Sequence, residues 1–311
     1  MIVAITGASG FIGKKLVQEH LAMNHEVRVL ARNISLFNKE KVRAFQGDLL
    51  NANLTNFVSG VDVLYHCAGE INDKSKIMYT NYSGTKRLFR LSRGNVKKWI
   101  QLSSIGVYGQ HKTGIIDEKC IERPSNIYEE SKFLADKFLL NNSKNYDIDV
   151  CILRPSNIYS HEMSNRSIFD LITAINKSLF FYIGKKIPTS HYTHVNDLVR
   201  ALILCSSSPK AIGQVYNLSY ESTFDILISA ICKELEIDCK IRHFPEWLAR
   251  GLSKFNKIWP SFPLTKSRID NLTSIAVYPS NRIEKELGFV FNYSLSKGMP
   301  EMIRKWRENN L

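Results

Sequence analysis

The chain has 311 residues, of which 44% are hydrophobic and 23% are charged, so it can bury one large core or two smaller ones. Its 42 Lys and Arg residues outnumber its 29 Asp and Glu residues, and the net charge of +13 favours anionic partners such as phosphates, nucleotides or an acidic membrane surface. The sequence has no basic block of the kind that binds nucleic acid, and no apolar run near the roughly 20 residues of a membrane span. We therefore expect neither a nucleic-acid partner nor a spanning segment.

The six cysteines are scattered singly, and no group of Cys and His residues has the spacing of a zinc site. Scattered cysteines inside apolar runs are typical of small core residues in a reducing compartment. We expect no bound metal and a cytoplasmic location.

Apolar runs of strand length alternate with helical patterns along the first half of the chain. Because nearly continuous apolar strands that alternate with helices form parallel sheets covered on both faces, we expect an α/β fold. The expected strands are 1–6, 26–31, 42–48, 61–69, 97–104 and 149–155, and helical patterns run from the first turn to about residue 23 and over 74–93 and 125–142.

Beyond about residue 156 this rhythm loosens, and shorter elements with more proline and aromatic residues follow. We therefore expect a nucleotide-binding core over 1–160, to which 190–220 returns. The remainder, 161–311, is expected to form mainly a smaller substrate-binding lobe.

The first turn reads TGASGFIG and places Gly7, Gly10 and Gly13 three residues apart, between an expected strand and an expected helix. Gly7 permits a tight turn, Gly10 lets the backbone approach a pyrophosphate, and Gly13 lets the helix pack close to the strand. The helix N-terminus then presents N–H groups and a positive dipole to the phosphates. This context predicts a Rossmann-type dinucleotide site, although the spacing is G-x-x-G-x-x-G.

The second expected strand ends in VRVLARN and offers no carboxylate for the ribose 2′-hydroxyl of NAD. Arg32, with Asn33 beside it, suits the 2′-phosphate of NADP, so the sequence favours NADP over NAD. Asp48 ends the third strand, where we expect it to meet the adenine edge.

The stretch YEESK places Tyr128 and Lys132 on one face of an expected helix. By itself this pair is typical of an ordinary helix surface, but further short motifs accompany it in a fixed order. They are GDL (47–49), HCAG (66–69), Asn81 in NYSGT, LSSIGVYG (102–109), LRPSNIY (153–159) and YTHVNDL (192–198).

In this order the motifs resemble those of the extended short-chain dehydrogenase/reductase family, in particular its nucleotide-sugar epimerases, dehydratases and reductases. The resemblance is clear over roughly residues 1 to 205 and loose beyond them. It implies a doubly wound parallel sheet, an NAD(P) cofactor, a nucleotide-sugar substrate and a role in polysaccharide biosynthesis. It also implies a homodimer formed through the helices near 74–93 and 125–142.

The resemblance implies that Ser104, Tyr128 and Lys132 are the catalytic residues. Tyr128 would act as general acid or base on a sugar oxygen, and Ser104 would hydrogen-bond the same oxygen. Lys132 and an oxidised nicotinamide would lower the phenol pKa from its ordinary value of about 10. Lys132 would also hold the nicotinamide ribose.

The resemblance also implies the residues that bind the cofactor and the substrate. For the cofactor they are Gly7, Ser9, Gly10, Phe11, Ile12, Gly13, Arg32, Asn33, Asp48, Leu49, Cys67, Ala68, Gly69, Asn81, Ser103, Tyr128, Lys132 and Pro155. For the substrate they are Ser104, Asn157 and Arg268. We expect His66, His194 and Asp197 to be structural.

One departure concerns the substrate diphosphate. Family members often have an arginine just ahead of the HV of YTHVNDL, and here that position is Ser190. Lys185, Lys186 and Arg268 are the candidates to take its place.

Another departure concerns the type of reaction. Family dehydratases place an acidic pair directly after the active-site Ser or Thr, whereas Ile105 and Gly106 follow Ser104. We therefore expect no dehydration. Arg32 favours reduction of a 4-keto sugar nucleotide, and a 4-epimerase with tightly held NAD remains open. A non-catalytic dinucleotide-sensing protein is a third hypothesis, which the intact Ser, Tyr and Lys set argues against.

Residues 243–264 are unusually aromatic and basic. This segment is expected either to pack as a lid over the substrate lobe or to make a weak membrane-surface contact. The residues that could share one amphipathic face are Trp247, Leu248, Leu252, Phe255, Ile258 and Trp259.

Overall fold

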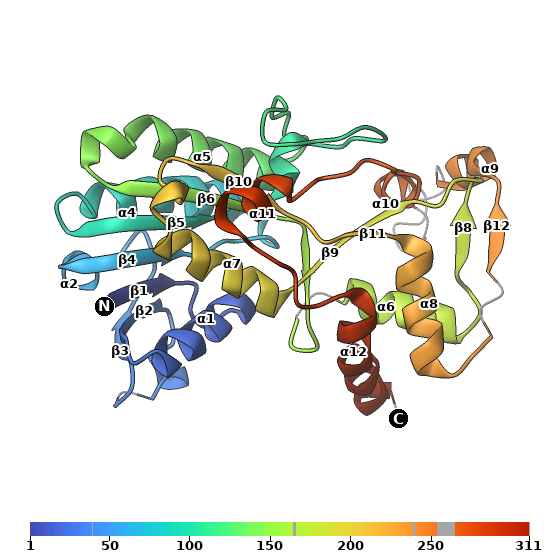
Figure 1. The fold of residues 1–311 in the computed structure, drawn as a ribbon, viewed down its shortest axis with the longest axis horizontal. Coiled ribbons are helices and arrows are strands. Elements are labelled where there is room, and N and C mark those ends of the chain that lie inside the picture. Colours follow the sequence, from blue (N-terminus) through green and yellow to red (C-terminus); the bar gives the residue numbers. More distant parts are fainter. Residues whose placement is uncertain (39, 164–165, 239–240, 254–264, 311) are drawn as a thin grey trace.

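A computed structural model describes residues 1–38, 40–163, 166–238, 241–253 and 265–310. Among these residues, seven parallel strands form one sheet in the order β10-β6-β5-β4-β1-β2-β3 (Figure 1). Their bounds are β1 Ile2–Thr6, β2 Glu26–Ala31, β3 Arg43–Gln46, β4 Val61–His66, β5 Val96–Leu102, β6 Asp149–Pro155 and β10 Val215–Leu218. The parallel, doubly wound sheet that the sequence predicts is confirmed.

The order of strands reverses between β1 and β4, which are neighbours in the sheet although β2 and β3 lie between them in the chain. Connections on either side of such a reversal leave the sheet in opposite directions and open a crevice at the carboxyl ends of the strands. The turn after β1 and the segments after β4 and β5 therefore border one crevice.

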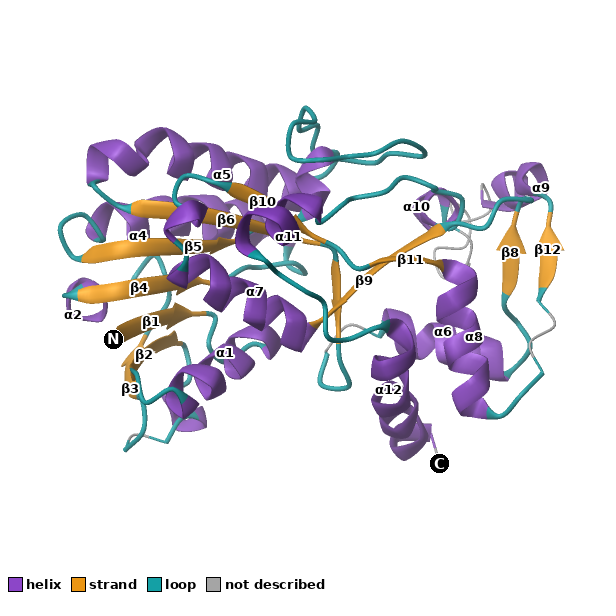
Figure 2. Cartoon of the chain, in the orientation of Figure 1, coloured by secondary structure: helices purple, strands orange, loops and turns teal. Residues whose placement is uncertain are grey.

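Helices cover both faces of this sheet, as Figure 2 shows. They are α1 Phe11–Ala22, α2 Thr55–Val58, α3 Lys74–Met78, α4 Thr85–Leu91, α5 Ile127–Tyr146, α7 Val195–Ser207 and α11 Asn281–Leu287, with short turns η1 Ile34–Leu36, η3 Ile105–Tyr108 and η4 Pro209–Ala211. Alternate residues of β1 enter different cores. Val3 and Ile5 pack with α1 and α7, whereas Ala4 packs with α4 and α5. A strand buried on both faces explains its continuous apolar run.

The helical pattern over 74–93 contains one irregularity. A π-helical turn, η2 Tyr79–Gly84, joins α3 to α4. The three segments follow one another without a loop, but the backbone hydrogen-bond pattern changes within η2. Single π turns are frequent at functional sites because they redirect one side chain. Here the turn carries Asn81.

The C-terminal part forms a second lobe beside the carboxyl edge of the sheet, at the right of Figure 1. Its helices are α6 Ser167–Asn176, α8 Phe224–Leu235, α9 Glu246–Leu252, α10 Lys266–Asn271 and α12 Leu295–Asn310. Its strands are β7 Asn157–Tyr159, β8 Phe181–Ile183, β9 Thr189–His194, β11 Glu221–Thr223 and β12 Arg242–Phe244, paired as β11-β9-β7 and β12-β8. The apolar faces of α6, α8 and α12 share one core.

Asp197 ties the chain that leads into α12 to the start of α7. Its carboxylate is fully buried and accepts hydrogen bonds from the backbone N–H groups of Asn292 and Tyr293 at 2.9 to 3.1 Å. Arg200, one turn along α7, donates a further hydrogen bond at 2.8 Å. This agrees with the structural role expected for Asp197.

We predict that Asp197→Ala lowers the free energy of unfolding by roughly 3 kcal/mol or more, because it leaves buried backbone donors without an acceptor. The midpoint of urea unfolding, at an unchanged m value, measures the loss. Asp170→Ala, at an exposed carboxylate on α6 with a 3.9 Å ion pair, is the control and should change little. Equal midpoints for the two variants would contradict the role of Asp197.

Candidate active site

The structure brings most of the predicted site residues to one edge of the sheet. They come from the turns after β1, β2, β3, β4 and β5, from the end of β6 and the start of β7, from the first two turns of α1 and α5, and, for Asn81, from the π turn η2 Tyr79–Gly84. Arg268 is the exception, because it lies on α10 in the C-terminal lobe, where its side chain is exposed.

The glycine turn packs directly against the end of β4. Gly7 has φ +68°, and a Cβ there would come within 2.7 Å of the Ala68 backbone nitrogen. A Cβ on Gly13 would overlap the carbonyl oxygen of Gly7. Both positions therefore require glycine, and the close approach aligns the start of α1 with the crevice.

The N-terminus of α1 is open to an anion. Its N-cap is Gly10, which provides no side-chain hydrogen bond, and the first turn contains no acidic residue. Free N–H groups at the positive end of a 12-residue helix are a suitable site for a pyrophosphate. The chain therefore fits a dinucleotide at this point.

The polar side chains that follow β2 and β3, where the adenosine ribose of a dinucleotide is expected, differ in how far they are already hydrogen-bonded within the protein. Arg32 and Asn33 both follow β2 and are exposed, but the Asn33 side chain accepts from the N–H and hydroxyl of Ser35. The Asp48 carboxylate is engaged by its own turn, through the N–H groups of Leu50 and Asn51. Arg32 thus remains the side chain best placed to reach a ribose substituent.

Asn81 holds the loop that follows β4. Its Oδ1 accepts from the N–H of Glu70 at 2.7 Å, and its Nδ2 donates to the Glu70 carbonyl and to Ser131 Oγ, each at 3.0 Å. These bonds connect the loop to α5. Asn81 therefore fixes the wall of the crevice through its neighbours, and Cys67, Ala68 and Gly69 lie along that wall.

Ser104, Tyr128 and Lys132 converge where β5 ends. Ser104 caps η3, with its Oγ accepting from the N–H of Gly106 at 3.0 Å, and the Tyr128 hydroxyl lies near the Ser104 side chain. Lys132 is only 5% exposed, and its ammonium donates to the carbonyl oxygen of Leu102 at 2.9 Å. The ammonium also lies beside Gly69, where any Cβ would come within 3.4 Å of Nζ.

Burial opposes charge on both titrating groups. It raises the pKa of Tyr128 to about 12, helped by the carboxylates of Asp136 and Glu129 and opposed by the hydrogen bond to Ser104. Burial lowers the pKa of Lys132, and the nearby Asp136 carboxylate opposes that decrease. In the protein alone, Tyr128 is therefore a phenol at neutral pH and not a phenolate.

Asp136, which sequence analysis missed, lies one helical turn beyond Lys132. It is 1% exposed, accepts from Ser103 Oγ at 2.7 Å and pairs with Arg154 Nε at 3.1 Å. Burial raises the pKa of this carboxyl, and the Arg154 guanidinium acts against that increase. The Ser103 hydroxyl proton is thus directed at Asp136, so Ser103 does not offer that proton to a cofactor.

Arg154 extends the network to the loop between η3 and α5. Its guanidinium donates to Tyr108 Oη at 3.0 Å and to Glu122 at 3.1 Å. Tyr108 in turn donates to Asn217 on β10 at 2.9 Å. The sequence signal that could have revealed this network is an arginine inside the apolar strand DVCILRP, because a fully buried guanidinium requires a buried partner.

Both histidines that sequence analysis assigned to structure do serve the fold. His66 hydrogen-bonds through one ring nitrogen to Thr6 and through the other to Thr85, each at 2.8 Å, and burial lowers its pKa to about 3. His194 accepts from the N–H of Asn196 at 3.3 Å and stacks on Tyr293 at 4.0 Å between ring centroids.

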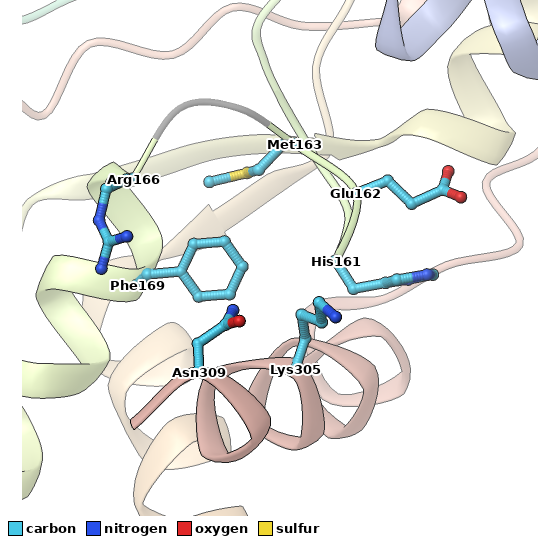
Figure 3. Close-up of a pocket in the computed structure, with 7 residues that line it drawn as sticks. All are labelled: His161, Glu162, Met163, Arg166, Phe169, Lys305 and Asn309. Carbon is cyan, nitrogen blue, oxygen red and sulfur yellow. The ribbon is translucent and has the colours of Figure 1, made fainter. Parts of the chain in front are cut away.

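Two hollows in the surface lie away from this crevice. Figure 3 shows the first, of about 360 Å³, between the segment after β7, α6 and α12. It is lined by His161, Glu162, Met163, Arg166, Phe169, Lys305 and Asn309. The second, of about 550 Å³, lies at the opposite edge of the sheet, where β1, β4 and β5 begin. None of the predicted site residues lines either hollow.

The charged residues that line the first hollow pair with neighbours outside its lining. His161 faces Glu301 at 3.3 Å and Lys305 faces Glu308 at 2.9 Å. Among the residues described, we find no cluster of three or more His, Cys, Asp and Glu side chains suited to a metal ion. The same residues include no helix with the length and apolar character of a membrane span.

Comparison with known proteins agrees with this geometry. Residues 3–219 match the model of the NAD dependent epimerase/dehydratase family. The chain is 25% identical to human sterol-4-alpha-carboxylate 3-dehydrogenase, decarboxylating, with 97% of this chain and 87% of that enzyme covered. It is 28% identical to UDP-glucose 4-epimerase of Mycolicibacterium smegmatis, with 70% and 77% covered.

Among solved structures, UDP-glucuronic acid 4-epimerase from Bacillus cereus in complex with NAD superimposes with a TM-score of 0.78. The two sequences are 21% identical, and the match covers 99% of this chain and 97% of the epimerase, which supports the fold. With the family model matching more than half of its length, the chain belongs to the NAD-dependent epimerase/dehydratase family, in the extended short-chain dehydrogenase/reductase group that its motifs resemble.

Proposed function

We propose that the protein is an NAD(P)-dependent oxidoreductase that acts at C4 of a nucleotide-activated sugar, and that it reduces a 4-keto group. The observation that carries this proposal is the convergence of Ser104, Tyr128 and Lys132 on one crevice, next to the uncapped N-terminus of α1. A dinucleotide bound with its pyrophosphate on α1 would supply the hydride for the sugar carbonyl.

The residues of the chain supply the proton and the positioning. Ser104 Oγ hydrogen-bonds the carbonyl oxygen, and Tyr128 gives that oxygen its proton as the carbonyl becomes a hydroxyl. Lys132 keeps a positive charge beside the phenolate that remains and is placed to hold the nicotinamide ribose. Solvent then returns a proton to Tyr128.

The electrostatics of Tyr128 favour reduction. A phenol whose pKa is about 12 carries its proton at neutral pH and is ready to donate it. Oxidation would require the phenolate first, which burial disfavours until a positive nicotinamide ring lies nearby. Reduction therefore needs no prior change in the protein.

Dehydration is disfavoured by the residues around Ser104. Ile105 and Gly106 provide no acid or base, and the nearest carboxylate is Glu129, beside Gly106. Glu129 accepts from the N–H and hydroxyl of Ser125, both at 2.7 Å, and so closes the start of α5. One of its two carboxylate oxygens, Oε2, is thereby engaged at the helix end.

The substrate class follows from charge and from the relatives. A net charge of +13 suits a substrate whose nucleoside diphosphate is anionic, and the attached sugar would then face the crevice. A 4-epimerase is the second candidate, because UDP-glucose 4-epimerase is among the relatives and the NAD-bound epimerase shares the fold. Asn157, exposed at the start of β7, and Arg268 are our candidates to contact the substrate.

We also propose a homodimer and a cytoplasmic location. The helices that the family resemblance assigns to the dimer are those near 74–93, now α3, η2 and α4, and near 125–142, now α5. They present exposed apolar side chains at Tyr79, Leu91 and Ile127. Burial of such side chains favours association.

The test of function is an absorbance assay of NADPH and NADH oxidation against a panel of 4-keto UDP- and dTDP-sugars. We expect turnover with at least one of them, and we expect Tyr128→Phe to lose about 10²- to 10⁴-fold in kcat while it binds cofactor normally, since only the proton donor is removed. Interconversion of UDP-sugars without net oxidation of added cofactor would establish the epimerase instead. Normal turnover by Tyr128→Phe would refute the assigned acid.

Arg32 provides a test of cofactor choice. Because a hydrogen bond to a charged group contributes about 1.5–3 kcal/mol, Arg32→Ala should weaken NADPH binding about 10- to 100-fold and leave NADH binding nearly unchanged. Fluorescence titration of the reduced cofactors measures both. Arg43→Ala, at an exposed arginine on the neighbouring strand, is the control. Equal losses for NADPH and NADH would show that Arg32 does not read the 2′-phosphate.

Asp136 provides a test of the proton donor. Removing its charge in Asp136→Asn lowers the pKa of Tyr128, while Glu129 and Lys132 remain in place. Reduction needs the protonated phenol, so the alkaline limb of the kcat/KM profile should move to lower pH, by about one pH unit. Asp136→Glu should keep the original profile.

The control for this experiment is Glu122→Gln, which removes the other carboxylate that pairs with Arg154 but lies on the loop after η3. Its profile should match that of the wild-type protein. Equal displacement of the limb in Glu122→Gln and Asp136→Asn would assign the effect to a loosened Arg154 and not to the charge beside Tyr128.

A further inference from the structure

Two strands of the C-terminal lobe end side by side at its outer tip. β8 and β12 are parallel, with Phe244 opposite Ile183, and the His243 ring nitrogen Nδ1 lies 2.8 Å from the carbonyl oxygen of Gly184. Figure 1 shows these strands and α9 at the end of the molecule farthest from β1 to β3. The turn after β8 and the start of α9 therefore form one surface.

Trp247 is the most exposed large apolar side chain among the described residues, at 75%. Its helix α9 buries Ala249 against Ile183 and Ile269. Residues two positions apart lie on nearly opposite sides of a helix, so Trp247 faces away from the core. Ile187, in the turn after β8, is also exposed at 44%.

The same surface is basic. The described segments 184–187 and 242–253 contain four Lys and Arg side chains and one carboxylate, a net charge of +3. Arg250 is neutralised by Glu246 at 2.7 Å and Asp270 at 2.9 Å. Lys185 and Lys186 are exposed, and within the described residues neither ammonium forms an ion pair. Two cations that form no ion pair among the described residues thus lie at the same tip of the lobe as an exposed tryptophan.

We propose that Lys185, Lys186, Ile187 and Trp247, here termed the tip patch, dock the protein on an anionic lipid surface. Tryptophan favours the boundary between headgroups and acyl chains, because its ring is apolar and its N–H is polar. Each lysine near such a surface is attracted to acidic headgroups. A soluble polyanion would engage the lysines but would leave Trp247 and Ile187 in water, so both features together favour a membrane.

The tip patch contains only one of the residues that were expected to share an amphipathic face over 243–264, namely Trp247. Trp247 is exposed, whereas Leu248 and Leu252 are partly buried against the lobe, so these three do not share one exposed face. Phe255, Ile258 and Trp259 lie outside the described residues. The docking surface is therefore built from two chain segments, not from one helix face.

Membrane docking would act on access to substrate and not on the chemistry. The tip patch contains none of the crevice residues Ser104, Tyr128 and Lys132, and it lies on the lobe that borders the crevice. An enzyme held this way works on molecules that are made or used at a membrane surface.

The experiment is flotation of the full chain with vesicles of phosphatidylcholine, with and without phosphatidylglycerol, at low and high salt. We expect co-flotation only with phosphatidylglycerol and its loss at high salt, because exposed charges are then screened. Lys185→Glu with Lys186→Glu should reduce partitioning about tenfold or more. Quenching of tryptophan fluorescence by brominated lipid should disappear in Trp247→Phe.

The matched control is Lys41→Glu with Lys144→Glu, which changes the net charge equally at exposed positions on the core. It should float like the wild-type protein, and fluorescence titration with NADH checks that each variant is folded. Failure of the wild-type protein to float, or an equal loss in the control, would overturn the proposal. So would binding to heparin or a DNA duplex under conditions where vesicles are not bound.

Discussion

The buried pair of Asp136 and Arg154 is the contact on which the geometry of the crevice depends. It joins α5, which carries Tyr128 and Lys132, to β6, and Ser103 adds the end of β5 to the same carboxylate. Two charges removed from water are tolerable only when they face each other closely, and separating them leaves an uncompensated charge in the interior. A helix that slid by one turn along the sheet would separate them. The pair therefore fixes the position of α5 along the sheet, and with it the position of Tyr128 relative to Ser104.

The same carboxylate influences the protonation states of Lys132 and Tyr128. Asp136 favours the charged form of Lys132 and the neutral form of Tyr128, so a cation and a proton donor can stand together in a buried place. Without this anion, burial alone would act on Lys132 and would lower its pKa further. Stability and chemistry thus depend on one interaction, because the residue that aligns α5 also keeps the phenol protonated until a substrate oxygen accepts the proton.

The sequence predicted those features that repeat along the chain or are set locally. Strand–helix alternation predicted the parallel sheet, and Gly7 and Gly13 marked contacts that any Cβ would prevent. Features that depend on distant partners were not predictable in this way. Asp136 and Arg154 are 18 residues apart, and neither belongs to a motif that requires the other. The π turn at Asn81 was also hidden, since the segments on either side of it are too short for one extra residue to show as a break in the apolar pattern.

The substrate side shows how a departure from the family pattern is accommodated. Ser190, at the position of the family's arginine, is 1% exposed on β9, and its hydroxyl lacks a hydrogen-bond partner among the described residues. An arginine at so enclosed a position would need room that this packing does not leave, so a diphosphate contact would have to come from another part of the lobe. Arg268 is exposed there on α10, whereas Lys185 and Lys186 stand at the outer tip beside Trp247. We therefore propose Arg268 as the contact to a substrate diphosphate, whereas Lys185 and Lys186, which form no ion pair among the described residues, are placed for a partner outside the crevice.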